Sequence, residues 1–160
     1  MMLNRNFIQD RDSFLHLLEL ELKRSLRYQS FTSVLLVEIP ANRKLDATKT
    51  TFFERVVNSL SSQIRETDII GTTNEQMIAI ILLNCDKRST SEVADRVSSW
   101  TSQYFGADNS RNDGTPSSRV GVGTACFPTH ATDSEHLLIT AAEMLETSKL
   151  QPETRSRFQP

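Results

Sequence analysis

The sequence predicts one α/β (α+β) domain in which helices cover a sheet of four or more strands. Stretches with helical hydrophobic spacing alternate with short runs of branched apolar residues, in the order helix, strand, helix, strand, strand, helix, strand, helix. The chain has 160 residues, of which 38% are hydrophobic and 24% charged. A chain of this length and composition can bury a sizeable core, so the disordered class is excluded.

The first half of the chain carries five predicted elements. A helix is expected over Asp10–Tyr28, where apolar residues recur at helical spacing after an aspartate that can cap it. Ser33–Ile39 is rich in branched residues and ends before a proline, a pattern typical of a buried strand. Apolar residues again recur at helical spacing over Thr50–Ile64, which predicts a second helix. Asp68–Thr72 and Met77–Leu83 are apolar runs separated by four polar residues, which predicts a β-hairpin.

The second half adds a helix, a strand and a final helix. Apolar and aromatic residues recur at helical spacing over Ser89–Phe105, and a polar loop rich in turn-forming residues is expected over Ala107–Ser118. Arg119–Phe127 is predicted to be a strand that ends before a proline. The last helix is expected over Asp133–Leu150, with an acidic or hydroxyl residue at its cap. Residues 151–160 have the composition of a loose tail.

Charge, hydropathy and cysteine content exclude several classes of protein. Eighteen basic and twenty acidic residues give a net charge of −2, whereas a protein that coats nucleic acid needs a strong basic excess. The apolar runs are too short to cross a bilayer, and the N-terminus does not have the pattern of a signal peptide. Cys85 and Cys126 have apolar neighbours and are expected to be reduced, packed thiols. We therefore expect a cytoplasmic protein that binds neither nucleic acid nor membrane.

Several segments together resemble one known family over roughly residues 8–150. They are the opening helix with Asp10-Arg11-Asp12-Ser13-Phe14, the strand Leu35-Leu36-Val37-Glu38-Ile39, the RxxD motif Arg65-Glu66-Thr67-Asp68, the strand Arg119-Val120-Gly121-Val122-Gly123 and the terminal helix ending in Thr147-Ser148-Lys149. Their order and spacing resemble the GGDEF-type diguanylate cyclase domains. The resemblance implies a nucleotidyl-cyclase-like fold, with a central, mostly antiparallel sheet of about five strands flanked by helices. It also implies a domain over residues 1–150.

The catalytic signature of that family is replaced. Asn74-Glu75-Gln76-Met77-Ile78 stands where the family has two glycines, two acidic residues and a phenylalanine. The glycines permit close approach of a nucleotide, and the acids hold a divalent cation and lie beside the reacting phosphate. A shift of one residue would restore one acid but neither glycine, and it would exchange the two faces of the strand. We therefore expect a degenerate GGDEF domain that is not an enzyme and has no magnesium cofactor.

The RxxD motif precedes the hairpin. In active relatives this motif, and not the hairpin, binds cyclic di-GMP as an inhibitory product. The resemblance therefore predicts a cyclic di-GMP site made by Arg65, Asp68 and Arg96, with Arg88 in reserve. Arginine offers a planar pair of donors for guanine O6 and N7, and an aspartate can accept from guanine N1–H and N2–H. The same spacing recurs at Arg43–Asp46, so position rather than spacing carries the prediction. Alternatively, Arg65 and Asp68 form an ion pair of about 0–1 kcal/mol at a helix end.

Three functions remain open from the sequence, one of which is an enzyme that still binds or hydrolyses a nucleotide; the other two are not enzymes. The favoured function is a catalytically inactive cyclic di-GMP receptor in bacterial signalling, which passes its ligand state to a partner protein or to an adjacent domain. The alternative is a pseudo-enzyme module that binds no nucleotide and serves for dimerisation or partner docking. A homodimer is compatible with both hypotheses.

Overall fold

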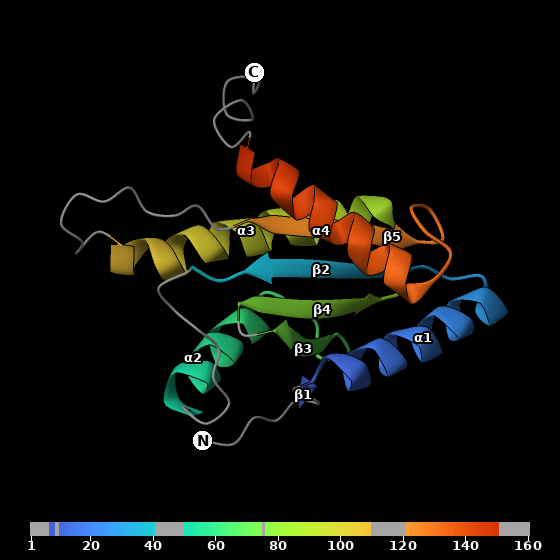
Figure 1. Ribbon diagram of the computed structural model, residues 1–160, viewed down its shortest axis with the longest axis horizontal. Coiled ribbons are helices and arrows are strands. Elements are labelled where there is room, and N and C mark those ends of the chain that lie inside the picture. The colour runs from blue at the N-terminus through green and yellow to red at the C-terminus, as the bar shows by residue number, and fades with distance from the viewer. Residues whose placement is uncertain (1–6, 9, 41–49, 75, 110–120, 151–160) are drawn as a thin grey trace.

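The computed structural model describes residues 7–8, 10–40, 50–74, 76–109 and 121–150, which form a five-stranded sheet covered by four helices (Figure 1). This arrangement confirms the predicted fold class. In chain order the elements are β1 (Phe7–Ile8), α1 (Arg11–Tyr28), β2 (Thr32–Glu38), α2 (Thr50–Ser61), β3 (Ile69–Asn74), β4 (Met77–Leu83), α3 (Lys87–Asn109), β5 (Val122–Phe127) and α4 (Ser134–Leu150).

The strands follow the order β1-β3-β4-β2-β5 across the sheet. Strand β1 runs parallel to β3, and every other neighbouring pair is antiparallel. The β3–β4 pair is the hairpin expected from the sequence. Strand β2 lies between β4 and β5, and its residue Leu35 pairs with Ile80 on one side and with Thr124 on the other. Residues 32–37 of β2 are all buried, because helices cover both faces of the sheet there.

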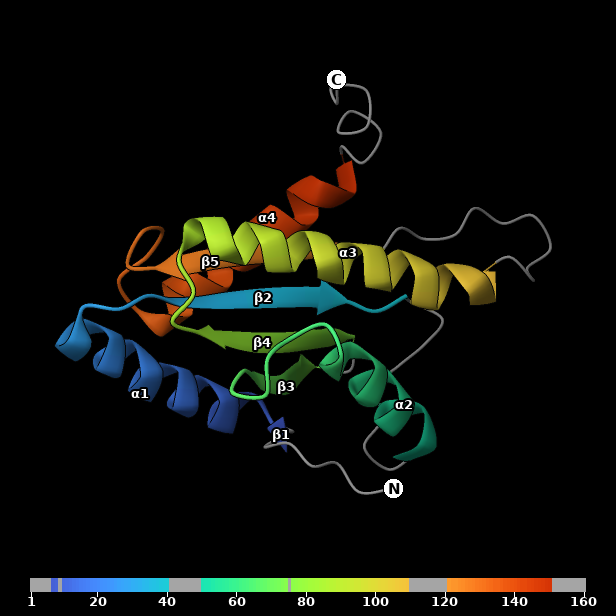
Figure 2. The same ribbon diagram turned by 180° about the vertical axis from the view of Figure 1, so that it is seen from behind.

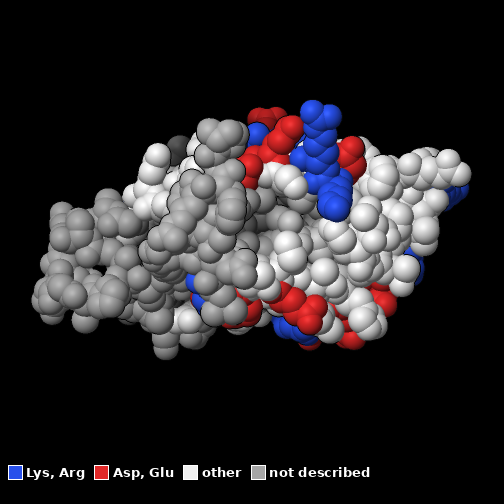
Figure 3. Space-filling view, turned by 90° about the horizontal axis from the view of Figure 1, so that it is seen from above, with Lys and Arg blue, Asp and Glu red and all other residues white. Residues whose placement is uncertain are grey.

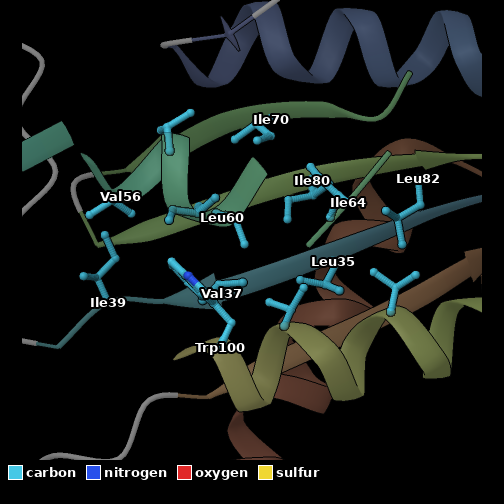
Figure 4. Packing of buried hydrophobic residues seen from close by; sticks show 14 of the residues in the cluster. Leu35, Val37, Ile39, Val56, Leu60, Ile64, Ile70, Ile80, Leu82 and Trp100 are labelled. Atoms are coloured by element: carbon cyan, nitrogen blue, oxygen red, sulfur yellow. The ribbon is translucent and has the colours of Figure 1, made fainter. Parts of the chain in front are cut away.

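Two apolar layers lie on opposite faces of the sheet. Helices α2 and α3 cover one face (Figure 2), where Leu60 and Trp100 belong to the same apolar cluster as Leu35 and Ile80 (Figure 4). Helices α1 and α4 cover the other face, where alternate strand residues meet their apolar sides. The period of two along the strands therefore assigns each residue to one layer or the other.

Side-chain caps define the starts of three helices. The carboxylate of Asp10 accepts from the Ser13 backbone N–H at 2.8 Å, which confirms the predicted cap of α1. Asp133 accepts from the His136 N–H at 2.9 Å at the start of α4. Asp86 accepts from the Ser89 N–H at 2.8 Å and so starts α3 two residues earlier than the sequence predicts. Each of these hydrogen bonds satisfies a backbone donor that the first turn leaves unpaired.

Other differences from the prediction concern short or terminal segments. Strand β1 was not predicted, because two residues are too few to display a period. The helix α3 continues through Ala107–Asn109, so the predicted loop begins too early. Helix α2 ends at Ser61 rather than Ile64, and tight turns follow it. The remainder of the predicted loop, Arg119–Val120 of the predicted strand and the tail 151–160 lie outside the described residues.

The two cysteines are buried free thiols, as predicted. Burial raises the pKa of the Cys85 thiol, which keeps it protonated and unreactive at neutral pH. Within the residues that the structure describes, no helix combines the length and the apolar character needed to traverse a bilayer.

Candidate functional site

The β3–β4 hairpin places the replaced catalytic signature beside the end of β2. Asn74 pairs with Met77 across the turn, and its side-chain oxygen accepts from the Gln76 N–H at 2.8 Å. The Ile39 N–H donates to the Gln76 carbonyl at 2.8 Å, and Met77 pairs with Glu38. The hairpin and the end of β2 are therefore joined by backbone hydrogen bonds. Glu75 lies outside the described residues.

A lysine from the last helix neutralises the carboxylate at the end of β2. The Lys149 ammonium lies 3.0 Å from one oxygen of Glu38 and 2.5 Å from the other, and 3.4 Å from Glu146. The Lys149 and Glu38 side chains are 26% and 23% exposed. The hydrogen bonds with Glu38 raise the pKa of Lys149, so the ion pair persists through the neutral range.

The RxxD motif lies at the corner between α2 and β3, and its two charged side chains contact each other. The Asp68 side chain is 1% exposed, whereas that of Arg65 is 51% exposed. Asp68 accepts from the Arg65 backbone N–H at 3.0 Å and from its guanidinium at 3.3 and 3.4 Å. The buried carboxylate therefore holds a half-exposed guanidinium at a defined place on the surface.

Both residues of the motif also bind the end of β4. The Leu83 N–H donates to Asp68 at 3.3 Å, and the Arg65 guanidinium donates to the Leu83 carbonyl. Strand β3 begins at Ile69, which pairs with Ile81, so β4 extends beyond it. The two side chains thus satisfy backbone groups that a longer β3 would otherwise pair. This is more than the surface ion pair considered from the sequence.

Arg96 reaches the same corner from α3. Its guanidinium donates twice to the Gln63 carbonyl, at 3.0 and 3.3 Å, and Gln63 lies in the turn that leads to Arg65. A pocket of about 400 Å³ adjoins Arg96 and is lined by Gln63, Asp95, Ser99, Trp100 and Gln103. The three predicted residues are therefore brought to one corner of the fold. The reserve residue, Arg88, is exposed in the first turn of α3.

Sequence reasoning missed the pairing of Glu38 with Lys149. The two residues are far apart in the chain, and each was noted for a different segment. Their contact arises because α4 packs on β5 and β2, which brings the last turn of α4 to the end of β2. The topology, rather than a local motif, was the missing information. Trp100 on α3 is buried, and its indole N–H donates to the Ser59 hydroxyl at 2.7 Å.

Comparison with known proteins gives a consistent result for the fold. The family model described as "Diguanylate cyclase, GGDEF domain" matches residues 7–155. Solved structures that resemble the chain include the GGDEF domain of PA1120 (TpbB or YfiN) from Pseudomonas aeruginosa, with 18% identity, 90% of this chain and 86% of that chain covered, and a TM-score of 0.65. A search among curated proteins finds no match.

Two further relatives show the range of the likeness. The active GGEEF domain of a diguanylate cyclase from Vibrio cholerae has 14% identity, covers 90% and 92% of the two chains and gives a TM-score of 0.65. DgcB from Caulobacter crescentus, solved with its coiled coil in complex with c-di-GMP, has 13% identity, 88% and 76% coverage and a TM-score of 0.63. These identities support a shared fold, and the family match spans nearly the whole sequence. The chain therefore belongs to the diguanylate cyclase GGDEF domain family.

Proposed function

We propose that this GGDEF domain does not synthesise cyclic di-GMP and instead binds it as a receptor, at the corner formed by Arg65, Asp68 and Arg96. Ligand binding there would be passed to a partner protein or an adjacent domain in bacterial signalling. The supporting observation is that two arginines from separate elements meet at the turn between α2 and β3, one of them fixed by a buried aspartate.

The residues of the hairpin support the loss of catalysis. Transfer of a nucleotidyl group needs a hard cation held by oxygen ligands close to the reacting phosphates. Gln76 is neutral, Met77 carries no acid, and Asn74 adds a side chain where the family has a glycine. A nucleotide would thus meet side chains where the family offers bare backbone.

The magnesium ion that the family uses does not fit the described residues of this hairpin. Glu38 supplies a carboxylate at the end of β2, but the Lys149 ammonium already lies against both of its oxygens. Binding of a divalent cation would require this ion pair to break, and Gln76 would offer at most a neutral amide oxygen. We therefore derive no reaction step through a metal at this place.

The chemistry of the corner suits a guanine dinucleotide. Arginine presents a rigid fork of donors that matches the O6 and N7 acceptors of guanine and can also bind phosphate oxygens. The Arg65 side chain is half exposed although its position is fixed, so little conformational entropy would be lost on binding. Arg96 borders an open pocket of about 400 Å³. Arg65 therefore offers one cationic fork at the corner, and Arg96 offers a second one beside a pocket that Asp95 also lines.

Asp68 has a different role in this conformation from the one predicted. Its carboxylate is covered and engaged with Arg65 and Leu83, so a direct bond to guanine N1–H would require Arg65 to move aside. In the proposed receptor, Asp68 positions Arg65, and the two arginines make the main contacts. The direct contact of Asp68 with the ligand stays a prediction.

One observation favours the alternative function. Arg65 and Asp68 complete the hydrogen bonding of β4 at Leu83, so the motif has a structural use that needs no ligand. A module that binds no nucleotide and acts by dimerisation or partner docking would keep the motif for this reason alone. The two functions differ in what happens when Arg96 is truncated, because Arg96 does not take part in the bonds to Leu83.

Isothermal titration calorimetry with cyclic di-GMP distinguishes the two. Arg96→Ala removes a guanidinium that, among the described residues, donates to the Gln63 carbonyl, and it should weaken binding at least tenfold while the domain stays folded. Arg65→Ala should weaken binding at least as much. Arg27→Ala is the matched control. It removes the same charge from an exposed position of α1, which covers the other face of the sheet, and it should leave the affinity unchanged.

Two results would overturn the proposal. Folded wild-type protein that releases no heat at high micromolar cyclic di-GMP would leave the docking module as the better function. Incubation with GTP and Mg²⁺, followed by chromatography, should yield no cyclic di-GMP and no hydrolysis product. Accumulation of either product would show that the domain retains catalysis.

A further inference from the structure

Among the described residues, strand β5 is an edge strand of the sheet. It pairs with β2 on one side, and Figures 1 and 2 both show it at the upper border of the sheet between α4 and α3. The Glu38 N–H donates to the Gly121 carbonyl at 3.0 Å, which fixes the alternation along β5. The backbone groups of Gly121 and Gly123 therefore face β2, and those of Val122, Thr124 and Cys126 face outward.

One end of this edge is already covered. The Cys126 N–H donates to the His130 ring nitrogen Nδ1 at 2.8 Å, and the His130 N–H donates to the Cys126 carbonyl at 2.7 Å. A turn thus satisfies both outward groups of Cys126. Within the described parts of the chain, no such hydrogen bond is recorded for the outward groups of Val122 and Thr124. These two residues leave two donors and two acceptors on an unpaired edge.

A groove lies directly over these groups. Its volume is about 400 Å³, its floor is Val122, Gly123 and Thr124, and its walls come from α3 and α4. The wall residues are Ser91, Ala94 and Asp95 on α3, and Met144, Thr147 and Ser148 on α4. Apart from Asp95 they are uncharged. Figure 3, which shows the molecule from above, has charged side chains along two borders of the face and uncharged residues between them in the described part.

The walls determine which occupants can reach the edge. Helix α4 lies close to β5 because Gly123 has no side chain, and α3 contacts β5 from the other side. The strand is therefore recessed between two helices. The β5 edge of a second copy would be recessed in the same way, so two such edges could not meet. A slender, extended chain is free of this obstacle.

The arrangement of donors and acceptors identifies the ligand chemistry. The outward groups of Val122 and Thr124 repeat every second residue, about 7 Å apart along a strand. An extended polypeptide presents N–H and C=O groups at the same repeat and so can satisfy all four. We propose that this groove binds an extended segment of a partner protein as a sixth strand, with small or β-branched uncharged side chains between α3 and α4. The lining of this groove shares one residue, Asp95, with the pocket beside Arg96.

NMR titration with a synthetic peptide tests the proposal. The probe is an acetylated, amidated peptide in which three threonines alternate with two valines between terminal lysines. On addition of the peptide to isotope-labelled protein, the amide signals of Val122 and Thr124 should shift, and their hydrogen exchange should slow. The same peptide with N-methyl groups on the amides of one edge cannot complete the ladder, and its binding should be at least tenfold weaker.

Two variants test the same contact from the side of the protein. Thr124→Pro removes an outward donor and leaves the pairing with β2, since proline is tolerated on an edge strand. Ala94→Arg fills the groove from its wall. Both should weaken peptide binding at least tenfold. Ser89→Arg, which adds the same side chain at an exposed position of α3 outside the groove, is the control and should bind like wild type.

Three outcomes would overturn the inference. They are unchanged Val122 and Thr124 signals at millimolar peptide, equal binding of the N-methylated peptide, and wild-type binding by folded Ala94→Arg. Sedimentation of the protein alone provides a further check. Self-association that Thr124→Pro abolishes would assign the edge to a second copy rather than to a partner peptide. If Thr124→Pro does not fold, Ala94→Arg and the methylated peptide still decide the question.

Discussion

Replacement of Gly123 by alanine tests the contact between α4 and the sheet. A Cβ at this position would lie 2.0 Å from the Ala141 carbonyl oxygen, 2.5 Å from the Leu145 backbone nitrogen and 2.7 Å from the Leu145 Cβ. Ordinary van der Waals contact begins near 3.4 Å. Since two of these three atoms belong to the backbone of α4, no rotamer change can relieve the clash. The whole helix would have to withdraw by more than about 1 Å.

The cost can be estimated from what α4 buries. Leu137, Ala141 and Leu145 are at most 1% exposed in the layer that α4 shares with α1. Overpacking in a core costs about 1–3 kcal/mol, and a rigid shift of α4 also loosens these side chains. We therefore expect Gly123→Ala to lower the free energy of unfolding by at least about 3 kcal/mol. This is a large part of the roughly 5–15 kcal/mol that stabilises a typical domain.

Gly121 offers an internal comparison on the same strand. The Cβ added there would meet Lys149 Cγ and Cδ at 2.8 Å and Leu145 Cδ2 at 2.9 Å, all of them side-chain atoms that can move. The expected loss for Gly121→Ala is about 1 kcal/mol or less. Urea unfolding followed by circular dichroism measures both values from the midpoint and slope. A Gly123→Ala variant within about 0.5 kcal/mol of wild type, or less impaired than Gly121→Ala, would refute the reasoning.

Two further predictions concern single contacts. Lys149→Met should cost about 1 kcal/mol at pH 7, because it leaves Glu38 without its partner. Folding raises the pKa of Lys149 above its ordinary value of 10.5. The contribution of Lys149 to the free energy of unfolding is therefore fully present below pH 10.5, and it is lost as the pH rises through the pKa of the folded state. Urea midpoints of the two proteins should therefore converge at strongly alkaline pH. Ser59→Ala leaves the buried Trp100 indole N–H unpaired and should cost about 1–3 kcal/mol by urea unfolding. Exposed Ser62→Ala should cost almost nothing, and equal losses would contradict the assignment.

Most of the fold could be predicted from local patterns. The branched runs around Leu35 and Ile80 and the helical spacing of Phe14, Leu18 and Leu22 specify elements that bury one or both faces, and the structure has them where expected. The parallel strand β1 could not be predicted, since its two residues gain their partner from β3, far along the chain. The exact first residues of helices were also harder to predict, because a capping residue such as Asp86 sets the start of a helix independently of where the apolar spacing begins.

The candidate site was predictable in part, for a different reason. Arg65 and Asp68 are three residues apart, so their contact is local and follows from the sequence. The burial of Asp68 and its bond to Leu83 depend on where β4 ends, and the place of Arg96 depends on the packing of α3. The Glu38–Lys149 pair required knowledge of the whole topology. Sequence patterns therefore identify which groups carry charge, whereas tertiary packing decides which of them remain exposed.

The position of β2 has a consequence for the ribosome-bound chain. Leu35 needs Ile80 on one edge and Thr124 on the other, and the second partner belongs to the last strand to be made. At roughly 5–20 residues per second, translation separates the two partners by a few seconds. During that interval a long apolar strand exposes one edge and one incomplete face, which is the kind of surface that nascent-chain chaperones shield. Slower elongation between residues 80 and 124 should therefore increase aggregation of newly made protein.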